Sequence, residues 1–341
     1  MMVKSMDLVF CTLFDSNYLD KGLTLYKSME RCMTDFRLYV FAFDDKCFEV
    51  LKSEQYKNLI PISLSEFETD DLLKVKAERT RAEYCWTCSP WIIKHVFDHY
   101  NESICTYLDA DMEFFSSPQV VFDEMRKNNC STIIVPHRFK DELAEKEAHD
   151  KQGSYCVEFN TFLNDKNGYE ALKWWADKCL EWCYYAVPGT TEWYGDQKYL
   201  NVFQEKFEGV MVCNHFGVGM APWNICLVDY VDEKDSIPYV RVIKTGIEYP
   251  LIIYHFENVS FITKHILHAS SRTSSKELHK VIYDPYIKRL IDNRLYIENK
   301  YGIVLSRERR VVTKSPLMRL YQKYILPFRR VKHKFDLYWV K

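Results

Sequence analysis

The chain has 341 residues and a formal net charge of −2, with 46 Lys and Arg against 48 Asp and Glu. This length allows one large α/β domain with an extension, or two domains. The balanced charge argues against nucleic-acid binding, no apolar run is long enough to cross a bilayer, and the N-terminus lacks the pattern of a secretion signal. The 12 cysteines are dispersed, and Cys85 and Cys88 have no partner pair at zinc spacing. We therefore expect a cytoplasmic protein with reduced thiols.

The first third of the chain predicts alternating strands and helices. Strands are expected at 7–13, 36–43 and 59–64, and helices at 19–33 and 47–56. This order is typical of a parallel sheet. The charged stretch 67–83 is expected to be partly helical. A helix over 85–100, capped by Ser89 with Pro90 in its first turn, then leads into the strand before Asp109.

The remainder continues the α/β pattern and then changes character. Strands are expected at 131–136, 155–163 and 251–256, and helices at 120–128, 139–152, 168–185 and 276–301. Asn160 interrupts the second of these strands. After a polar linker at 270–275, basic residues far outnumber acids from Arg307 onward. We predict an α/β domain over 1–270 and a helical, basic-aromatic extension over 271–341.

Two carboxylates follow the end of one predicted strand. Asp109 and Asp111 come directly after strand-forming residues and are separated only by Ala110. In an open α/β sheet, ligands collect beyond the carboxyl ends of strands, and two adjacent acids repel each other unless a cation lies in front of them. A divalent metal that carries a phosphate is the candidate. A solvated acidic turn is the alternative. A haloacid-dehalogenase phosphatase is disfavoured because Met112 and Glu113 follow the motif.

The two acids resemble the D-x-D motif of nucleotide-sugar-dependent glycosyltransferases with the GT-A fold. Other segments are similar, in the expected order, to those of family 8, the glycogenin and lipopolysaccharide galactosyltransferase group, and of related bacterial nucleotide-diphospho-sugar transferases. These segments are 12–29 with Tyr18 and Lys21-Gly22, EFNTF at 158–162, GDQKYLN at 195–201 and IYHF at 253–256. The resemblance covers about residues 7–260. It implies a Rossmann-like mixed, mostly parallel sheet flanked by helices, with the C-terminal helical extension outside it.

The resemblance also implies which residues would bind the donor. Mn²⁺ or Mg²⁺ would be held by Asp109, Asp111 and His255. The nucleotide sugar, with a UDP-sugar favoured, would contact Thr12, Asp15, Tyr18, Arg81, Asp109 and Ala110. Tyr18 can stack on a base, and Arg81 offers a planar fork to a phosphate. For each residue taken alone, a plain structural role is the alternative.

Three residues are candidates for catalysis. Asp196 can orient the sugar or accept the proton of the acceptor hydroxyl. The side-chain amides of Asn160 and Gln197 can hydrogen-bond sugar hydroxyls or a developing charge. The alternatives are a helix cap for Asp196 and satisfied core amides for the other two.

The chain departs from the family pattern at two points. The segment after Asn160 lacks the usual Gly, and no Lys-Pro-Trp follows His255. The donor-phosphate lysine of that segment therefore has no counterpart. Arg79, Arg81 and Lys264 are the possible substitutes, and we favour Arg81 because it precedes the helix that leads to the D-x-D strand.

Tryptophans suggest a carbohydrate-binding surface. Trp174, Trp175 and Trp182 lie at helical spacing and are expected in the core. Trp193 and Trp223 lie in predicted loops and are the better candidates for stacking on a sugar.

The basic-aromatic segment over 307–341 allows peripheral contact with a membrane. Such a segment can lie on an anionic bilayer, which suits a lipid-linked acceptor and a location at the inner face of the membrane. A helix docked on the domain is the alternative.

We expect a metal-dependent glycosyltransferase that moves a sugar from a nucleotide-diphosphate sugar to a glycan or lipid-linked acceptor in surface polysaccharide synthesis. The family likeness implies retention of configuration. A nucleotidyltransferase is one alternative, but it needs a Gly-rich first loop and 11–18 has no Gly. A non-catalytic glycan-binding or scaffold relative is the other, and it need not bind metal.

Overall fold

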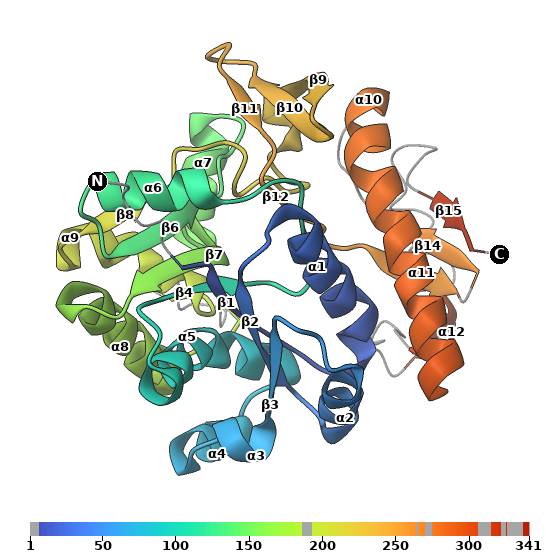
Figure 1. Ribbon diagram of the computed structural model, residues 1–341, viewed down its shortest axis with the longest axis horizontal. Coiled ribbons are helices and arrows are strands. Elements are labelled where there is room, and N and C mark those ends of the chain that lie inside the picture. The colour runs from blue at the N-terminus through green and yellow to red at the C-terminus, as the bar shows by residue number, and fades with distance from the viewer. Residues whose placement is uncertain are drawn as a thin grey trace.

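The computed structural model describes residues 7–185, 193–263, 265–269, 275–305, 315–321, 325 and 337–340. Their centre is a seven-stranded sheet in the order β3-β2-β1-β4-β7-β6-β8, flanked by helices (Figure 1). The strand pairs are mostly parallel, and only the pairs that β7 makes are antiparallel. This is the mixed, mostly parallel α/β fold class expected from the sequence.

The first half of the sheet is parallel and buried. It consists of β1 (Val9–Phe14), β2 (Arg37–Ala42), β3 (Leu59–Ser63) and β4 (Ile104–Leu108). Every residue of β1 and β4 is buried, as expected for strands covered on both faces. The connections contain η1 (Ser16–Tyr18), α1 (Leu19–Cys32), α2 (Asp45–Glu54), α3 (Leu64–Phe67), α4 (Asp70–Lys76) and α5 (Arg81–Tyr100). The predicted strands in this half agree with the structure to within about two residues.

Helix α5 begins at Arg81, four residues before the expected start at Cys85, and Ser89 does not cap it. Its cap is Thr80, whose side chain accepts a hydrogen bond from the Glu83 amide, while the Glu83 carboxylate accepts one from the Thr80 amide at 2.8 Å. This capping box satisfies two amides at the helix end, and Pro90 lies inside the helix. The cap expected at Ser89 is wrong, because Thr80 and Glu83 cap the helix and Ser89 lies inside it. The earlier start places Arg81 in the first turn.

Strand β7 (Tyr155–Leu163) runs antiparallel between β4 and β6 (Thr132–Pro136). Its pairing with β6 is irregular, because Ile133 lies opposite Thr161 whereas Val135 lies opposite Cys156. The residues between these two positions leave the β6 ladder, as in a bulge. The interruption expected at Asn160 does not occur in the strand itself: it continues to Leu163, Asn160 lies opposite Tyr107 of β4, and only the pairing with β6 is irregular.

The other elements of the second half of the α/β domain lie around β7. They are β5 (Met112–Phe114), α6 (Gln119–Lys127), α7 (Glu142–Lys151), α8 (Lys166–Glu181), η2 (Gln197–Val202), α9 (Phe203–Lys206) and β8 (Val210–Val212). Trp175 of α8 is fully buried and Trp174 packs against the core, as expected. Trp182 follows α8 and is half-buried.

A three-stranded antiparallel sheet projects from the domain at the top of Figure 1. It contains β9 (Val228–Lys234), β10 (Ile237–Val242) and β11 (Glu248–Pro250), preceded by η3 (Ile225–Leu227). The sequence did not predict these strands, because much of β9 is charged and exposed and shows no clear alternation.

Strand β12 (Ile253–His255) pairs with β5 in a separate two-stranded ribbon. His255 lies opposite Met112, and the Phe256 amide donates a hydrogen bond of 2.8 Å to the Asp111 carbonyl. This ribbon brings residue 255 beside the end of β4.

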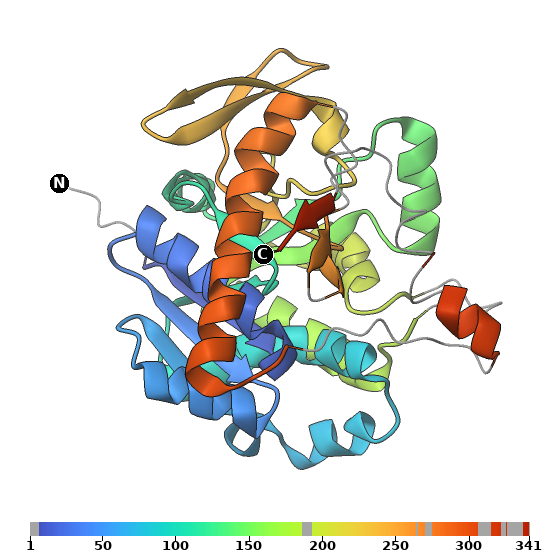
Figure 2. The same cartoon turned by 90° about the vertical axis from the view of Figure 1, so that its right-hand side faces the viewer.

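The C-terminal part contains a long helix that packs against the first helix. It contains β13 (Ser260–Thr263), β14 (Ile266–His268), α10 (Lys276–Leu278), a π-helical segment η4 (His279–Tyr283), α11 (Asp284–Tyr301), α12 (Pro316–Leu320) and β15 (Leu337–Trp339). Helix α11 lies along α1 (Figure 2). There the Asn293 side chain accepts a hydrogen bond from Lys27 at 2.6 Å and donates one to Thr24 at 2.9 Å.

Parts of the predicted extension lie outside the described residues, namely most of the polar linker at 270–275 and of the basic segment after Arg307. Among the described residues, no helix is both long enough and apolar enough to cross a membrane. All 12 cysteines are free thiols.

Candidate metal centre

Three potential metal ligands meet at the carboxyl end of β4. Asp109 and Asp111 follow this strand, and His255 ends β12 in the neighbouring ribbon. His255 Nε2 lies 3.2 Å from an Asp111 oxygen and 3.7 Å from an Asp109 oxygen. One ligand atom of each residue lies within 4.8 Å of those of the other two. The structure thus brings together the three residues predicted as metal ligands.

The chemistry of these side chains fits a divalent cation. Carboxylate oxygens suit Mg²⁺ and Mn²⁺, and an imidazole nitrogen adds a ligand that transition metals accept. A buried polar atom without a partner lies close behind them. It is Oε1 of Glu158, which makes no hydrogen bond within the part of the chain that the structure describes. The cluster can therefore accept a divalent ion.

Lys21 is a fourth member of this cluster, and the sequence did not reveal its role. It is 3% exposed, and its Nζ donates a hydrogen bond of 2.8 Å to Asp111 Oδ2. Nζ also lies 4.7 Å from the centre of the Tyr18 ring. The next residue, Gly22, lets α1 pass close to β1, since a Cβ there would lie 2.3 Å from the Phe14 ring. The Lys21-Gly22 pair was the available signal, but nothing in it indicated the contact with Asp111.

Charges within the cluster shift one another's protonation. Burial raises the pKa of Asp109 to about 7, even though the His255 charge opposes this rise. Burial also favours a higher pKa for Asp111, but Lys21 and His255 hold its pKa well below the usual value. Burial lowers the pKa of His255, yet its hydrogen bond with Asp111 and other contacts raise that pKa well above the ordinary value. Metal binding therefore has to displace a proton from His255.

A cavity of about 700 Å³ lies on one side of the cluster, between the end of β1 and the start of α5. Its lining includes five of the six residues predicted to contact the donor, namely Asp15, Tyr18, Arg81, Asp109 and Ala110, together with Asp111. Asp15 accepts a hydrogen bond of 2.8 Å from the Asn17 amide and forms an ion pair with Arg81. Arg81 is 59% exposed, so its guanidinium is accessible from the cavity.

Thr12 does not line this cavity. It is fully buried in β1, and its Oγ1 makes no hydrogen bond among the residues that the structure describes. The strand turns this side chain into the core, away from the loop that was expected to hold the ligand.

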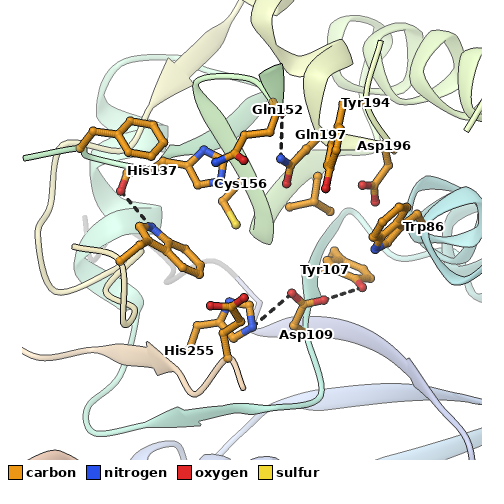
Figure 3. Close-up of a pocket in the computed structure, with 15 residues that line it drawn as sticks. Trp86, Tyr107, Asp109, His137, Gln152, Cys156, Tyr194, Asp196, Gln197 and His255 are labelled. Carbon is orange, nitrogen blue, oxygen red and sulfur yellow. Dashed lines mark hydrogen bonds and ion pairs between the residues drawn. The ribbon is translucent and has the colours of Figure 1, made fainter. Parts of the chain in front are cut away.

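A second cavity, of about 450 Å³, lies on the other side of the cluster. It shares Trp86, Tyr107 and Asp109 with the first. Figure 3 shows Asp109 and His255 on one side of this cavity and Asp196 and Gln197 on the other. Asp109 accepts a hydrogen bond of 2.8 Å from the Tyr107 hydroxyl, which fixes the carboxylate where the two cavities meet.

Two of the three candidate catalytic residues line the second cavity. Asp196 is 4% exposed, burial raises its pKa to about 7, and its side chain caps no helix. Gln197 donates a hydrogen bond of 2.8 Å to the Gln152 carbonyl. Asn160 is fully buried in β7 and lines neither cavity, and both its side-chain polar atoms lack partners within the described ranges. Asn160 therefore does not share a cavity with the other two.

Aromatic side chains dominate the rest of the second cavity. Trp86, His137, Tyr194 and Trp223 line it, and only Trp223 was singled out from the sequence. The Trp223 indole donates to the His137 carbonyl at 3.1 Å, and its ring meets the His255 ring edge-on at 5.6 Å. The other three residues come from separate loops and helices, so no local pattern could have grouped them.

Arg79 and Trp193, two further candidates from the sequence, line neither of the two cavities. Arg79 is 8% exposed and donates to the carbonyls of Cys179 and Leu180 at 2.8 and 2.6 Å, so it ties the loop before α5 to α8 and does not face a phosphate. Trp193 stacks on Tyr199 with ring centres 4.4 Å apart and lines neither cavity. Lys264 lies outside the described residues.

Fold and site together define an α/β protein with a candidate divalent-metal centre at the end of a central strand and a cavity on each side of it. No protein-family model matches the chain. The chain belongs to the family of "Uncharacterized protein YfnD" of Bacillus subtilis (strain 168), to which it is 32% identical over 290 residues, 83% of this chain and 89% of YfnD. It is also 27% identical to "Uncharacterized protein YfnF" of the same strain over 307 residues, 88% of this chain and 98% of YfnF.

Solved structures of glycosyltransferases resemble the chain more distantly. The galactosyltransferase LgtC, in complex with donor and acceptor sugar analogs, is 12% identical with a TM-score of 0.48 over 83% of this chain and 100% of LgtC. Mouse xyloside xylosyltransferase 1 is 12% identical with a TM-score of 0.46 over 74% of this chain and 98% of that one. Likenesses at this level carry no argument about activity, which has to rest on the site itself.

Proposed function

We propose that this protein is a metal-dependent glycosyltransferase that moves a sugar from a nucleotide-diphosphate sugar to a glycan or a lipid-linked acceptor. The position of Asp109 is the observation that carries the proposal. Its carboxylate stands beside Asp111 and His255 at the junction of two cavities. A group-transfer enzyme needs such an arrangement, with a site for each substrate and a charged centre where they meet.

The first cavity suits the nucleotide. The Tyr18 ring, 40% exposed, can stack on a base. Asp15 can accept a hydrogen bond from the base or ribose, and Arg81 can turn from Asp15 to the diphosphate. Bound by the two aspartates and His255, Mn²⁺ or Mg²⁺ would supply positive charge at the diphosphate oxygens.

The second cavity suits the sugars. Aromatic faces of Trp86, Tyr194 and Trp223 offer apolar contact to a pyranose ring. Asp196 has a buried oxygen, Oδ2, without a hydrogen-bond partner among the described residues. With a pKa near 7, this carboxyl group is suited to accept the proton of an acceptor hydroxyl. Gln197 can hold a sugar hydroxyl beside it.

The finer points rest on the sequence resemblance alone. Retention of configuration, a UDP-sugar donor and a role in surface polysaccharide synthesis follow from the likeness to family 8. We also propose that the 271–341 extension contacts a membrane surface at its inner face. Leu317 and Leu320 in α12 are 81% and 56% exposed, and the sequence around them is basic, a combination that favours anionic lipid.

Calorimetry with UDP-, GDP- and CDP-sugars, with and without Mn²⁺, tests the proposal. We expect one of these donors to bind, and to bind more tightly with the metal. Asp111→Asn should remove the metal-dependent part of binding, whereas Asp123→Asn, an exposed acid on α6, should not change it. If no nucleotide sugar binds in either condition, the protein is not a glycosyltransferase. Binding of a nucleoside triphosphate with a sugar phosphate would instead favour a nucleotidyltransferase.

A further inference from the structure

His255 is held at both of its ring nitrogens by carboxylates. On the side away from the cavity junction, Glu158 Oε2 lies 2.8 Å from His255 Nδ1. On the other side, Nε2 faces Asp111 at 3.2 Å. Glu158 belongs to β7 and is fully buried. The imidazole ring is therefore fixed between the sheet and the candidate metal ligands.

A buried carboxylate at this place has a high energetic cost unless its charge is compensated. Compensation comes from His255, which forms an ion pair with Glu158, and from the charge of Arg138, which attracts Glu158. Arg138 is itself anchored by hydrogen bonds of 2.7 and 2.8 Å to the carbonyls of Val218 and Cys213. A Cβ on Gly219 would lie 2.6 Å from Arg138 Nη1 and 3.3 Å from Glu158 Oε1, so a glycine lets these groups come close.

We propose that Glu158 is a positioning residue for the metal centre: it accepts the Nδ1–H of His255 and thereby directs Nε2 toward the ion. This inference rests on the metal dependence of the proposed function and adds a residue to it. Histidine ligands in metalloproteins commonly donate their second N–H to a carboxylate, which fixes the tautomer and the ring orientation and strengthens the ligand. Glu158 supplies that acceptor from β7, a strand of the central sheet.

Cys156 is the other side chain that reaches His255 from β7. Its sulfur, Glu158 and His255 form a second group of ligand atoms within 4.8 Å of one another. A carboxylate is a stronger hydrogen-bond acceptor than a thiol, and Glu158 Oε2 lies 2.8 Å from His255 Nδ1.

Manganese affinity measured on the full chain tests the inference, with the electron paramagnetic resonance signal of free Mn²⁺ as the readout. We expect Glu158→Gln to weaken Mn²⁺ binding by roughly 10- to 100-fold. We expect His255→Ala to weaken it as well, and the double variant to be no weaker than His255→Ala alone. This non-additivity is the sign of a residue that acts through another.

Glu102→Gln is the matched control. Glu102 is also a buried carboxylate, and it accepts hydrogen bonds from Arg37 and Tyr39 at 2.6 and 2.7 Å. It precedes β4, at the end opposite to Asp109. The control should unfold at a lower temperature than the wild type but bind Mn²⁺ with an affinity within about twofold of it.

Glu158→Asp is a second variant, which tests the inference if Glu158→Gln does not fold. It keeps the buried charge but withdraws the oxygen from Nδ1, so we expect a smaller loss of Mn²⁺ affinity. Wild-type affinity in both folded Glu158 variants overturns the inference, as does an equal loss from Glu158→Gln in the His255→Ala background. Either result leaves the proposed function intact. If the wild type itself binds no Mn²⁺, the metal dependence fails and this inference fails with it.

Discussion

Lys21 and Asp111, 90 residues apart in the chain, form a 2.8 Å hydrogen-bonded ion pair beneath the candidate metal centre. The lysine belongs to the first turn of α1, and the aspartate follows β4. The ammonium group neutralises one of two adjacent carboxylates before any metal arrives. The centre therefore does not depend on the ion to keep its acids together.

Replacing Lys21 by Met should make the protein more dependent on metal. Without the ammonium group, Asp111 loses one of the two cationic groups that offset its repulsion with Asp109, His255 being the other, which lowers the stability of the metal-free protein. The same change removes a positive charge that opposes cation binding, so the rise in unfolding temperature on adding Mn²⁺ should grow, on the order of 1–3 °C. Thermal unfolding with EDTA and with Mn²⁺ measures both effects.

Lys27→Met is the control on the same helix. It breaks the contact with Asn293 and should lower the unfolding temperature equally with and without metal. An identical Mn²⁺ response in Lys21→Met and the wild type would contradict the assigned role of the ion pair.

Asp196→Asn should raise stability at alkaline pH while lowering turnover. Burial raises the pKa of Asp196 from 3.8 to about 7, so the native state binds this proton more tightly than the unfolded chain does. The carboxyl group therefore destabilises the native state increasingly as the pH rises from about 4 to about 7. The variant lacks this loss and should unfold a few degrees higher at about pH 8, yet turn over roughly 10²- to 10⁴-fold more slowly.

Unfolding temperatures recorded across this pH range, for Asp196→Asn and the wild type, check the prediction. The two proteins should converge below about pH 4, where the Asp196 carboxyl group is protonated in both the folded and the unfolded chain. Parallel curves over the whole range would show that Asp196 does not titrate as the structure indicates.

Tyr18→Ala and Tyr194→Ala should distinguish the roles of the two cavities in substrate binding. Each tyrosine lines one cavity and not the other. Loss of a ring that stacks on a base costs roughly 0.5–1.5 kcal/mol, so Tyr18→Ala should raise the Kd of the donor by about 2- to 12-fold. Tyr194→Ala should raise the KM of the acceptor and change the Kd of the donor less than Tyr18→Ala does. Equal effects of both variants on the donor would argue against separate binding sites.

Tyr286 lies in the predicted extension, and Tyr286→Ala should nevertheless lower the free energy of unfolding of the α/β domain. The Tyr286 ring stacks on Phe256 with ring centres 3.6 Å apart, and the neighbouring Tyr283 shares a 2.9 Å hydrogen bond with Tyr254. Removing a fully buried aromatic ring costs about 3–5 kcal/mol. Chemical denaturation gives this value directly. An effect below about 1 kcal/mol would mean that the extension folds independently of the domain, with a boundary near residue 270.

Much of the fold could be predicted from local patterns. The buried strands β1, β2, β4 and β7 are runs of apolar, strand-forming residues with sharp ends, and each was predicted close to its observed bounds. Strand β9 was missed because its exposed, charged residues look like those of a loop. The start of α5 was misplaced because two cap signals competed and only the folded chain shows which one is used.

The candidate site could be predicted only where a short segment carries the chemistry. Asp109 and Asp111 are visible as a pair, and the resemblance added His255. Lys21 and Glu158 were missed because their contacts join distant parts of the chain, and a lone lysine or glutamate has no pattern of its own. Asn160 was expected at the site, but β7 turns its side chain into the interior.

The ribbon of β5 and β12 has a consequence for how the protein folds. Its pairing places His255 opposite Met112 and so beside the two aspartates, and its two strands are separated by more than a third of the chain. Contacts between such distant segments form slowly, because a long loop must close before they can be made. We therefore expect a refolding chain to acquire Mn²⁺ affinity late, after the parallel strands have paired. A newly synthesised chain can have no complete metal centre until β12 has emerged from the ribosome.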